Sequence, residues 1–129
     1  MYKDENPFIP DLFTRFFLHL SGLQDDRFVP VQQVHSVKEL VKASGLIAYG
    51  SFGEITKRED TSQMVEGRRI VHYVQPFYLL TPMKGEETMR VEVLTEGVEP
   101  SPSIEDPLNK RFPGAVAEGE YVVFLRKIP

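Results

Sequence analysis

The chain has 129 residues, a length typical of one domain, and 15 Lys and Arg against 19 Asp and Glu give a formal net charge of −4. This balance excludes a generic phosphate-binding surface, which needs an excess of clustered cations. Cysteine is absent, which excludes disulfides, thiolate metal ligands and cysteine nucleophiles.

The first predicted element is an amphipathic helix over residues 12–23, which follows an extended lead with two prolines. Its apolar residues recur at helical spacing: Leu12, Phe13, Phe16, Phe17, Leu20 and Leu23. The favoured interpretation is that residues 1–35 form a helical lead that packs on the rest of the domain. The alternative is an exposed aromatic face for a partner protein or for self-association, formed by Phe13, Phe16, Phe17 and Leu20.

The same segment is not expected to be a membrane span or a secretory signal. A span needs roughly 18 uninterrupted apolar residues, and Arg15 and His19 interrupt this one. A secretory signal begins with a basic stretch, whereas Asp4 and Glu5 stand near the start here. The sequence therefore fits a cytoplasmic chain or the mature form of an extracytoplasmic one.

A second helix is predicted after a connector over residues 24–35. Ser36 and Glu39 have the spacing of a capping box, in which each side chain bonds the other's backbone amide. Val37, Leu40 and Val41 give the helix one apolar face. Gly45 stands where a left-handed residue often ends a helix.

The rest of the chain is predicted to form strands. Glycines inside the first one, Gly50 and Gly53, suggest a strand that coils, as in a small closed barrel. Two segments are expected to be irregular: a mobile hairpin loop at 57–67 and a long proline-containing segment at 97–119. Apolar and alternating patterns place the strands at residues 46–56, 68–81, 88–95 and 120–128.

Long strands without intervening helices argue against a βαβ sheet. The predicted fold class is mainly β (α+β): a small antiparallel barrel like the oligonucleotide/oligosaccharide-binding (OB) fold, preceded by two short helices. The barrel domain is expected to span residues 36–129.

Three segments resemble the tissue-inhibitor-of-metalloproteinase-like, or netrin-module-like, barrels. Residues 36–51 (SVKELVKASGLIAYGS) resemble the short helix and first strand of those domains. Residues 78–85 (YLLTPMKG) and 118–125 (EGEYVVFL) resemble a strand end and the closing strand. The resemblance covers residues 36–128 and implies the OB-type fold. It does not imply the zinc-chelating mechanism of the animal inhibitors, which requires an N-terminal cysteine and disulfides.

No catalytic, metal-binding or cofactor-binding motif stands out. The histidines, His19, His35 and His72, are widely separated, and none has the spacing of paired ligands on a helix. Gly50-Ser51-Phe52-Gly53 is not a nucleophile elbow, because that motif needs Gly-x-Ser-x-Gly at a strand-to-helix turn. We therefore expect a non-enzymatic protein with no cofactor and no metal, and an enzyme without a readable motif is kept as a further alternative.

A possible ligand face combines aromatic and cationic residues of the strands: Tyr49, Phe52, Arg68, Arg69 and Tyr73. OB-type barrels bind oligosaccharides or single-stranded nucleic acids through such residues. The overall negative charge argues against nucleic acid. The favoured prediction is therefore an interaction or accessory module with a protein partner or self-association. An oligosaccharide-binding or single-strand-binding barrel is the alternative.

Overall fold

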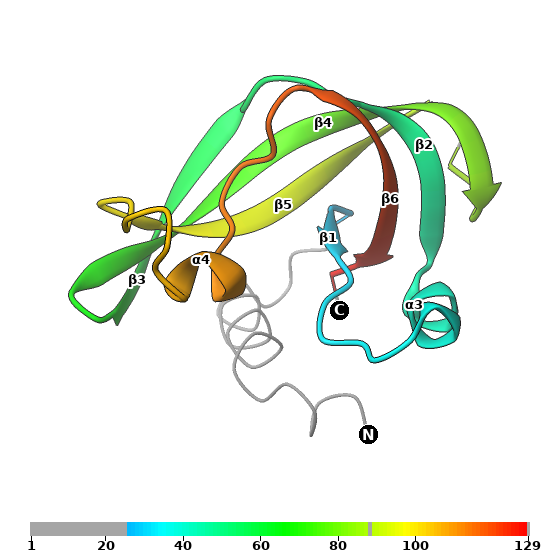
Figure 1. Ribbon diagram of the computed structural model, residues 1–129. Helices are drawn as coiled ribbons and strands as arrows, with labels where there is room; N and C mark the ends of the chain where they lie inside the picture. Colours follow the sequence, from blue (N-terminus) through cyan, green and yellow to red (C-terminus); the bar gives the residue numbers. More distant parts are fainter. Residues whose placement is uncertain (1–25, 88, 129) are drawn as a thin grey trace.

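Five strands close into a barrel at the centre of the domain (Figure 1). The computed structural model describes residues 26–87 and 89–128. Their elements, in chain order, are β1 (Phe28–Pro30), α3 (Val37–Ala43), β2 (Leu46–Phe52), β3 (Lys57–Val65), β4 (Arg68–Lys84), β5 (Arg90–Glu99), α4 (Leu108–Arg111) and β6 (Gly119–Lys127). The prediction of a mainly β, OB-like small barrel is confirmed.

The barrel closes because β4 is long enough to have different neighbours along its length. The strand order is β2-β6-β1-β5-β4-β3, and a further pairing of β2 with β4 completes the ring. Residues 68–74 of β4 pair with β3, whereas residues 77–84 pair with β2. Strand β3 therefore lies outside the ring as an edge strand. Among the strands that the structure describes, only β1 and β5 pair in parallel.

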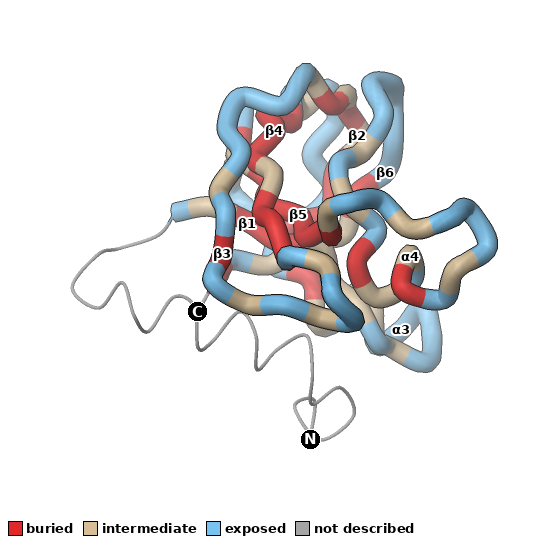
Figure 2. Tube along the Cα trace, turned by 90° about the vertical axis from the view of Figure 1, so that its left-hand side faces the viewer, coloured by how far each residue is buried: buried red, intermediate tan, exposed pale blue. Residues whose placement is uncertain are grey.

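Alternating residues of these strands fill the barrel, and buried positions gather along β4 and β5 (Figure 2). Burial of these apolar side chains is the main force that holds the strands together. The largest buried cluster consists of Phe28, Leu46, Ala48, Phe52, Phe77, Val91, Val93, Val123 and Leu125.

Helix α3 confirms the second predicted helix and the Ser36 half of its capping box, whereas the Glu39 side chain bonds the amide of His35 instead of that of Ser36. The Glu39 amide donates to Ser36 Oγ over 3.1 Å, and Glu39 Oε1 accepts from the His35 amide over 2.7 Å. The left-handed ending predicted at Gly45 is wrong: Ser44 ends the helix in an extended conformation, and Gly45 has no positive φ. Because the Gly45 amide donates to Leu125 O, the chain passes directly into the barrel.

The hairpin loop predicted at 57–67 is instead strand β3 and a tight turn. Only Glu66 and Gly67 form the turn, both with positive φ, as a two-residue hairpin requires. The segment is polar because most of its side chains are exposed on an edge strand. Cross-strand pairing with β4 supplies the hydrogen bonds that a polar composition does not reveal.

Strand β1 lies within the predicted connector, so the sequence analysis misses it. Its three residues are too few to show a period, and their strand conformation depends on pairing with β5 and β6. Phe28 contributes to the barrel core even though it precedes the predicted barrel domain. The first predicted helix, with Phe13, Phe16, Phe17 and Leu20, lies outside the described residues.

The segment predicted as irregular from residue 97 is more ordered than expected at its start and in its middle. Strand β5 continues to Glu99 through Gly97, where a Cβ would lie 2.8 Å from the Tyr73 ring and 3.1 Å from Gly114 Cα. Helix α4 then packs Leu108 and, just after it, Phe112 against the sheet. In the part of the chain that is described, no helix is long and apolar enough to cross a membrane.

Candidate functional site

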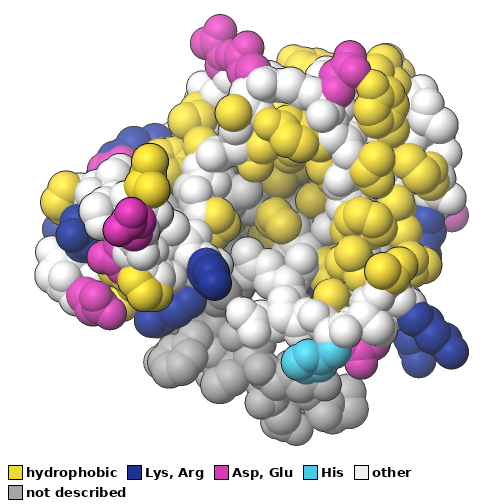
Figure 3. Space-filling model, viewed as in Figure 1, with side chains coloured by type: hydrophobic (Ala, Val, Ile, Leu, Met, Phe, Trp, Pro, Cys, Tyr) yellow, Lys and Arg dark blue, Asp and Glu magenta, His cyan; other side chains and the backbone are white. Residues whose placement is uncertain are grey.

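An apolar pocket of about 320 Å³ opens in the barrel wall beside β6. In Figure 3 it appears as a central hollow bordered by hydrophobic side chains. The lining comes from β1 and the residue after it, α3, β2, the β5–β6 connection and β6: Pro30, Val31, Leu40, Phe52, Val116, Tyr121, Val122, Val123, Phe124 and Leu125. The volume is at the lower end of the range typical of small-ligand sites.

The floor of the pocket is continuous with the barrel core. Val123 and Leu125 point inward from β6 and belong to the main buried cluster. The Phe52 ring meets Tyr121 edge-on at a centroid distance of 5.7 Å and Phe77 at 4.9 Å. Since these rings pack against one another, the floor is held in a fixed shape.

One wall of the pocket is fastened by the buried side chain of Gln75 on β4. Its Nε2 donates to Val116 O over 2.7 Å and to Gly53 O over 3.1 Å, and its Oε1 accepts from the Val116 amide over 2.9 Å. The carboxamide thus bonds both backbone groups of Val116, as a neighbouring strand would. Gln75 therefore positions the β5–β6 connection at the pocket.

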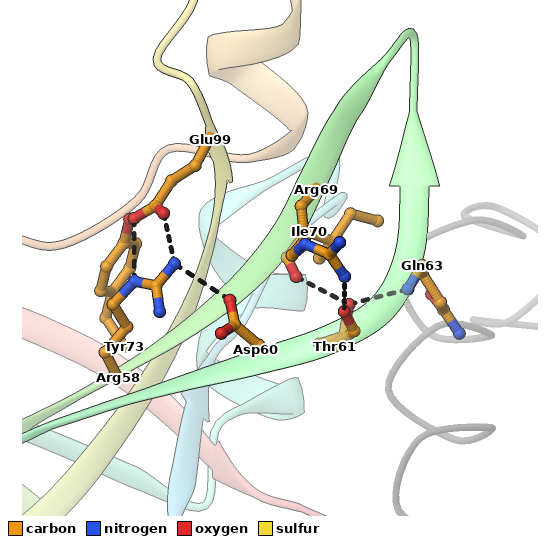
Figure 4. A network of polar contacts seen from close by, with 8 residues as sticks. All are labelled: Arg58, Asp60, Thr61, Gln63, Arg69, Ile70, Tyr73 and Glu99. Carbon is orange, nitrogen blue, oxygen red and sulfur yellow. Dashed lines mark hydrogen bonds and ion pairs between the residues drawn. The ribbon is translucent and has the colours of Figure 1, made fainter.

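A second polar cluster joins β3, β4 and β5 away from the pocket (Figure 4). Arg58 bonds both carboxylate oxygens of Glu99 and lies 3.0 Å from Asp60, while the Tyr73 hydroxyl donates to Glu99 over 2.7 Å. Bonds from Arg58 and then Tyr73 lower the pKa of Glu99 to about 2. Burial first, and then the bond to Glu99, raises the pKa of Tyr73 to about 12. These shifts keep Glu99 ionised and Tyr73 protonated at neutral pH, which suits a structural tie between strands.

His72, on β4, is buried beside Glu96 of β5. Nε2 of His72 lies 3.0 Å from Oε2 of Glu96, and the two residues are paired across the strands. Both side chains are almost completely buried. Among residues 26–87 and 89–128, no three His, Cys, Asp or Glu side chains gather into a potential metal site.

The five residues of the predicted ligand face lie in two places. Phe52 lines the pocket, and Tyr49, also on β2, donates its hydroxyl to Glu120. Tyr73 belongs to the second polar cluster, at the other half of β4. The two arginines there bond backbone carbonyls: Arg68 that of Pro100 and Arg69 that of Thr61. The face remains a prediction, but these contacts separate its two halves along β4.

Sequence reasoning missed most of the pocket, because its lining comes from five segments that only the fold brings together. One signal was present: β6 is apolar on both faces, since Val122 and Phe124 alternate with Val123 and Leu125. A strand with one solvent-facing side normally shows polar residues at every second position. Comparisons with protein families, with curated proteins and with solved structures give no match for this chain.

Proposed function

We propose that this chain is a non-enzymatic protein-interaction or accessory module that holds an apolar part of its partner in the pocket beside β6. The observation that carries the proposal is the pocket itself, an open apolar hollow on a rigid barrel. Apolar concavities of this kind take up the anchoring side chains of partner proteins, which contribute most of the binding energy.

A protein partner fits the pocket better than an oligosaccharide or a single-stranded nucleic acid. None of the pocket-lining residues is charged, and nucleic-acid grooves combine aromatic rings with cations. At the other half of the predicted ligand face, the cation Arg58 is already paired with Glu99 and Asp60. The alternative ligands follow from the barrel class alone.

The resemblance to tissue-inhibitor-of-metalloproteinase-like barrels is retained within this proposal. It agrees with an accessory, non-enzymatic role, but it assigns no partner. The inhibitory mechanism of the animal proteins is not part of the proposal, because the chain has no cysteine to chelate zinc.

Selection from phage-displayed random linear peptides tests the function without knowledge of the partner. We expect peptides with large apolar side chains to be enriched on the wild-type protein. Leu40→Trp places a larger side chain at the pocket wall and is expected to lose these peptides. The matched control is Val37→Trp, on the same helix but 74% exposed and outside the pocket.

The proposal predicts that Val37→Trp binds the selected peptides as the wild type does. Thermal melting of both variants shows whether the fold is retained. Failure to enrich peptides above a surface without protein contradicts the proposal. Peptides that bind equally well to Leu40→Trp also contradict it, because they do not use the pocket.

A further inference from the structure

Among the residues that the structure describes, one edge of β6 has no strand beside it for part of its length. Hydrogen bonds on this edge run from the Ile128 amide to Arg27 O over 3.1 Å and from the Val31 amide to Phe124 O over 2.9 Å. Since backbone groups alternate between the two edges of a strand, the amide and carbonyl of Val122 point to the same edge. Strand β1 ends at Pro30, and the chain then turns away toward α3.

Val122 is therefore the first residue beyond the end of β1 whose amide and carbonyl both point to this edge without a partner strand among the described residues. Among residues 26–87 and 89–128, its side chain is 49% exposed and no strand pairs with this edge there. The opposite edge of β6 pairs with β2 from Leu125 to Gly119, so Val123 directs its backbone groups into the barrel wall. The two edges of β6 at this point therefore differ: one is paired with β2, and the other has no described partner strand.

The free edge borders the apolar pocket. Tyr121, Val122 and Val123 belong to the edge segment and to the pocket lining. An extended chain placed along this edge would continue the line of β1. Its backbone would bond Val122, and every second side chain would point toward the pocket. Unpaired backbone groups with adjoining apolar pockets are the two features of sites that bind peptides by strand addition.

The charges near the Gly119 end of the edge are negative. Residues 46–56 and 116–125 contain Glu54, Glu118 and Glu120 and no Lys or Arg. These three glutamates are exposed, and they lie at one end of the edge, because Phe52 pairs with Gly119 there. Figure 3 shows acidic side chains above the hollow. A partner segment with a Lys or Arg at this end would complement them.

We propose that an extended segment of a partner protein adds to β6 as a strand, with an apolar side chain in the pocket and a basic residue near Glu118 and Glu120. The inference rests on the proposed function and specifies how the partner is held. It favours a peptide backbone as the ligand, because an extended chain offers a carbonyl and an amide at the spacing of the amide and carbonyl of Val122.

The test uses a synthetic peptide from the selection on the wild-type protein. Val122→Pro removes the amide that the peptide would bond, but no bond to β2, since that amide points away from β2. We expect this variant to bind the peptide about tenfold more weakly, as for the loss of one backbone hydrogen bond. Val122→Thr keeps the amide and changes only a side chain that lines the pocket, so its affinity measures the part of the loss that comes from the side chain.

Three further measurements use the same peptide. Hydrogen exchange of the Val122 amide is expected to slow when the peptide binds, whereas exchange of the Val123 amide stays the same. The peptide amides are N-methylated one at a time. Methylation of an amide that faces β6 is expected to abolish binding. Replacing the peptide's basic residue by Gln is expected to weaken binding at low salt.

The outcomes separate this inference from the proposed function. Pocket-dependent peptides that bind Val122→Pro normally and leave exchange of the Val122 amide unchanged overturn strand addition but keep the binding module. Absence of any pocket-dependent peptide overturns both. A further outcome, seen by sedimentation, is that the wild-type protein is a dimer and that Val122→Pro is a monomer. That result overturns the inference, because a second copy of the chain would then occupy the edge.

Discussion

Replacing Gln75 by Leu tests whether one buried side chain holds the pocket wall. Gln75 is 2% exposed and makes three hydrogen bonds, all to backbone groups of Gly53 and Val116. Leu has a similar volume, so the change removes the bonds without opening a large cavity. The β5–β6 connection then has no polar partner on this part of β4.

The expected loss follows from the number of bonds. A buried hydrogen bond contributes a net of about 1 kcal/mol, and an unsatisfied buried partner costs about 1–3 kcal/mol. For three bonds we expect the free energy of unfolding to fall by about 3 kcal/mol. Solvation of the Val116 backbone, if the connection swings outward, would reduce this loss but would also open the pocket.

Urea denaturation measures the loss, and hydrogen exchange of the Val116 amide measures the local opening. Gln63→Leu is the matched control, because the carboxamide of Gln63 has no hydrogen bond to the described residues and should change stability by less than about 0.5 kcal/mol. A loss below about 1 kcal/mol for Gln75→Leu, with unchanged exchange at Val116, would refute the reasoning.

Two further predictions concern the strands. Gly50→Ala should lower the free energy of unfolding, measured in urea, by about 3 kcal/mol, because its Cβ would lie 2.1 Å from Tyr78 O. A Cβ at Gly45 would have no neighbour within 4 Å, so Gly45→Ala is the control and should be nearly neutral. Equal stability of the two variants would contradict this prediction. Burial and the bond to Glu99 raise the pKa of Tyr73 to about 12 in the folded state, whereas the pKa of an unfolded tyrosine is about 10. The folded state therefore loses stability as the pH rises from about 10 to about 12, and Tyr73→Phe should lack that part of the loss. Phenolate absorbance, compared between wild type and variant, should place the titration of Tyr73 near the upper value, and titration near pH 10 would contradict the structure.

Several elements could be predicted because their signals are local. The capping box at Ser36 and Glu39 needs only residues three positions apart, and α3 forms where it predicts. Strand β6 shows its run of β-branched and aromatic residues within nine positions. The glycine at position 50 indicated a coiled strand, and the ring of Phe77 and the backbone of Tyr78 do lie against it.

Other elements were missed because their cause lies elsewhere in the chain. Strand β3 is polar and looks like a loop, yet β4 supplies its hydrogen bonds. Gly97 looks like the end of a strand, but it is small because Gly114 crosses over it. The role of Gln75 depends on Val116, 41 residues away, and no local pattern joins the two.

The sequence by itself determined the mainly β class, the short helix α3 and the absence of cysteine chemistry, because composition and short periods carry these properties. The tertiary structure alone decided that β4 would close the ring, that β1 would stop at Pro30 and that no described strand would pair with the edge of β6 at Val122, beside an apolar pocket. These features depend on where long-range strand pairing begins and ends. That is set by the packing of side chains distant in sequence, which no local spacing records.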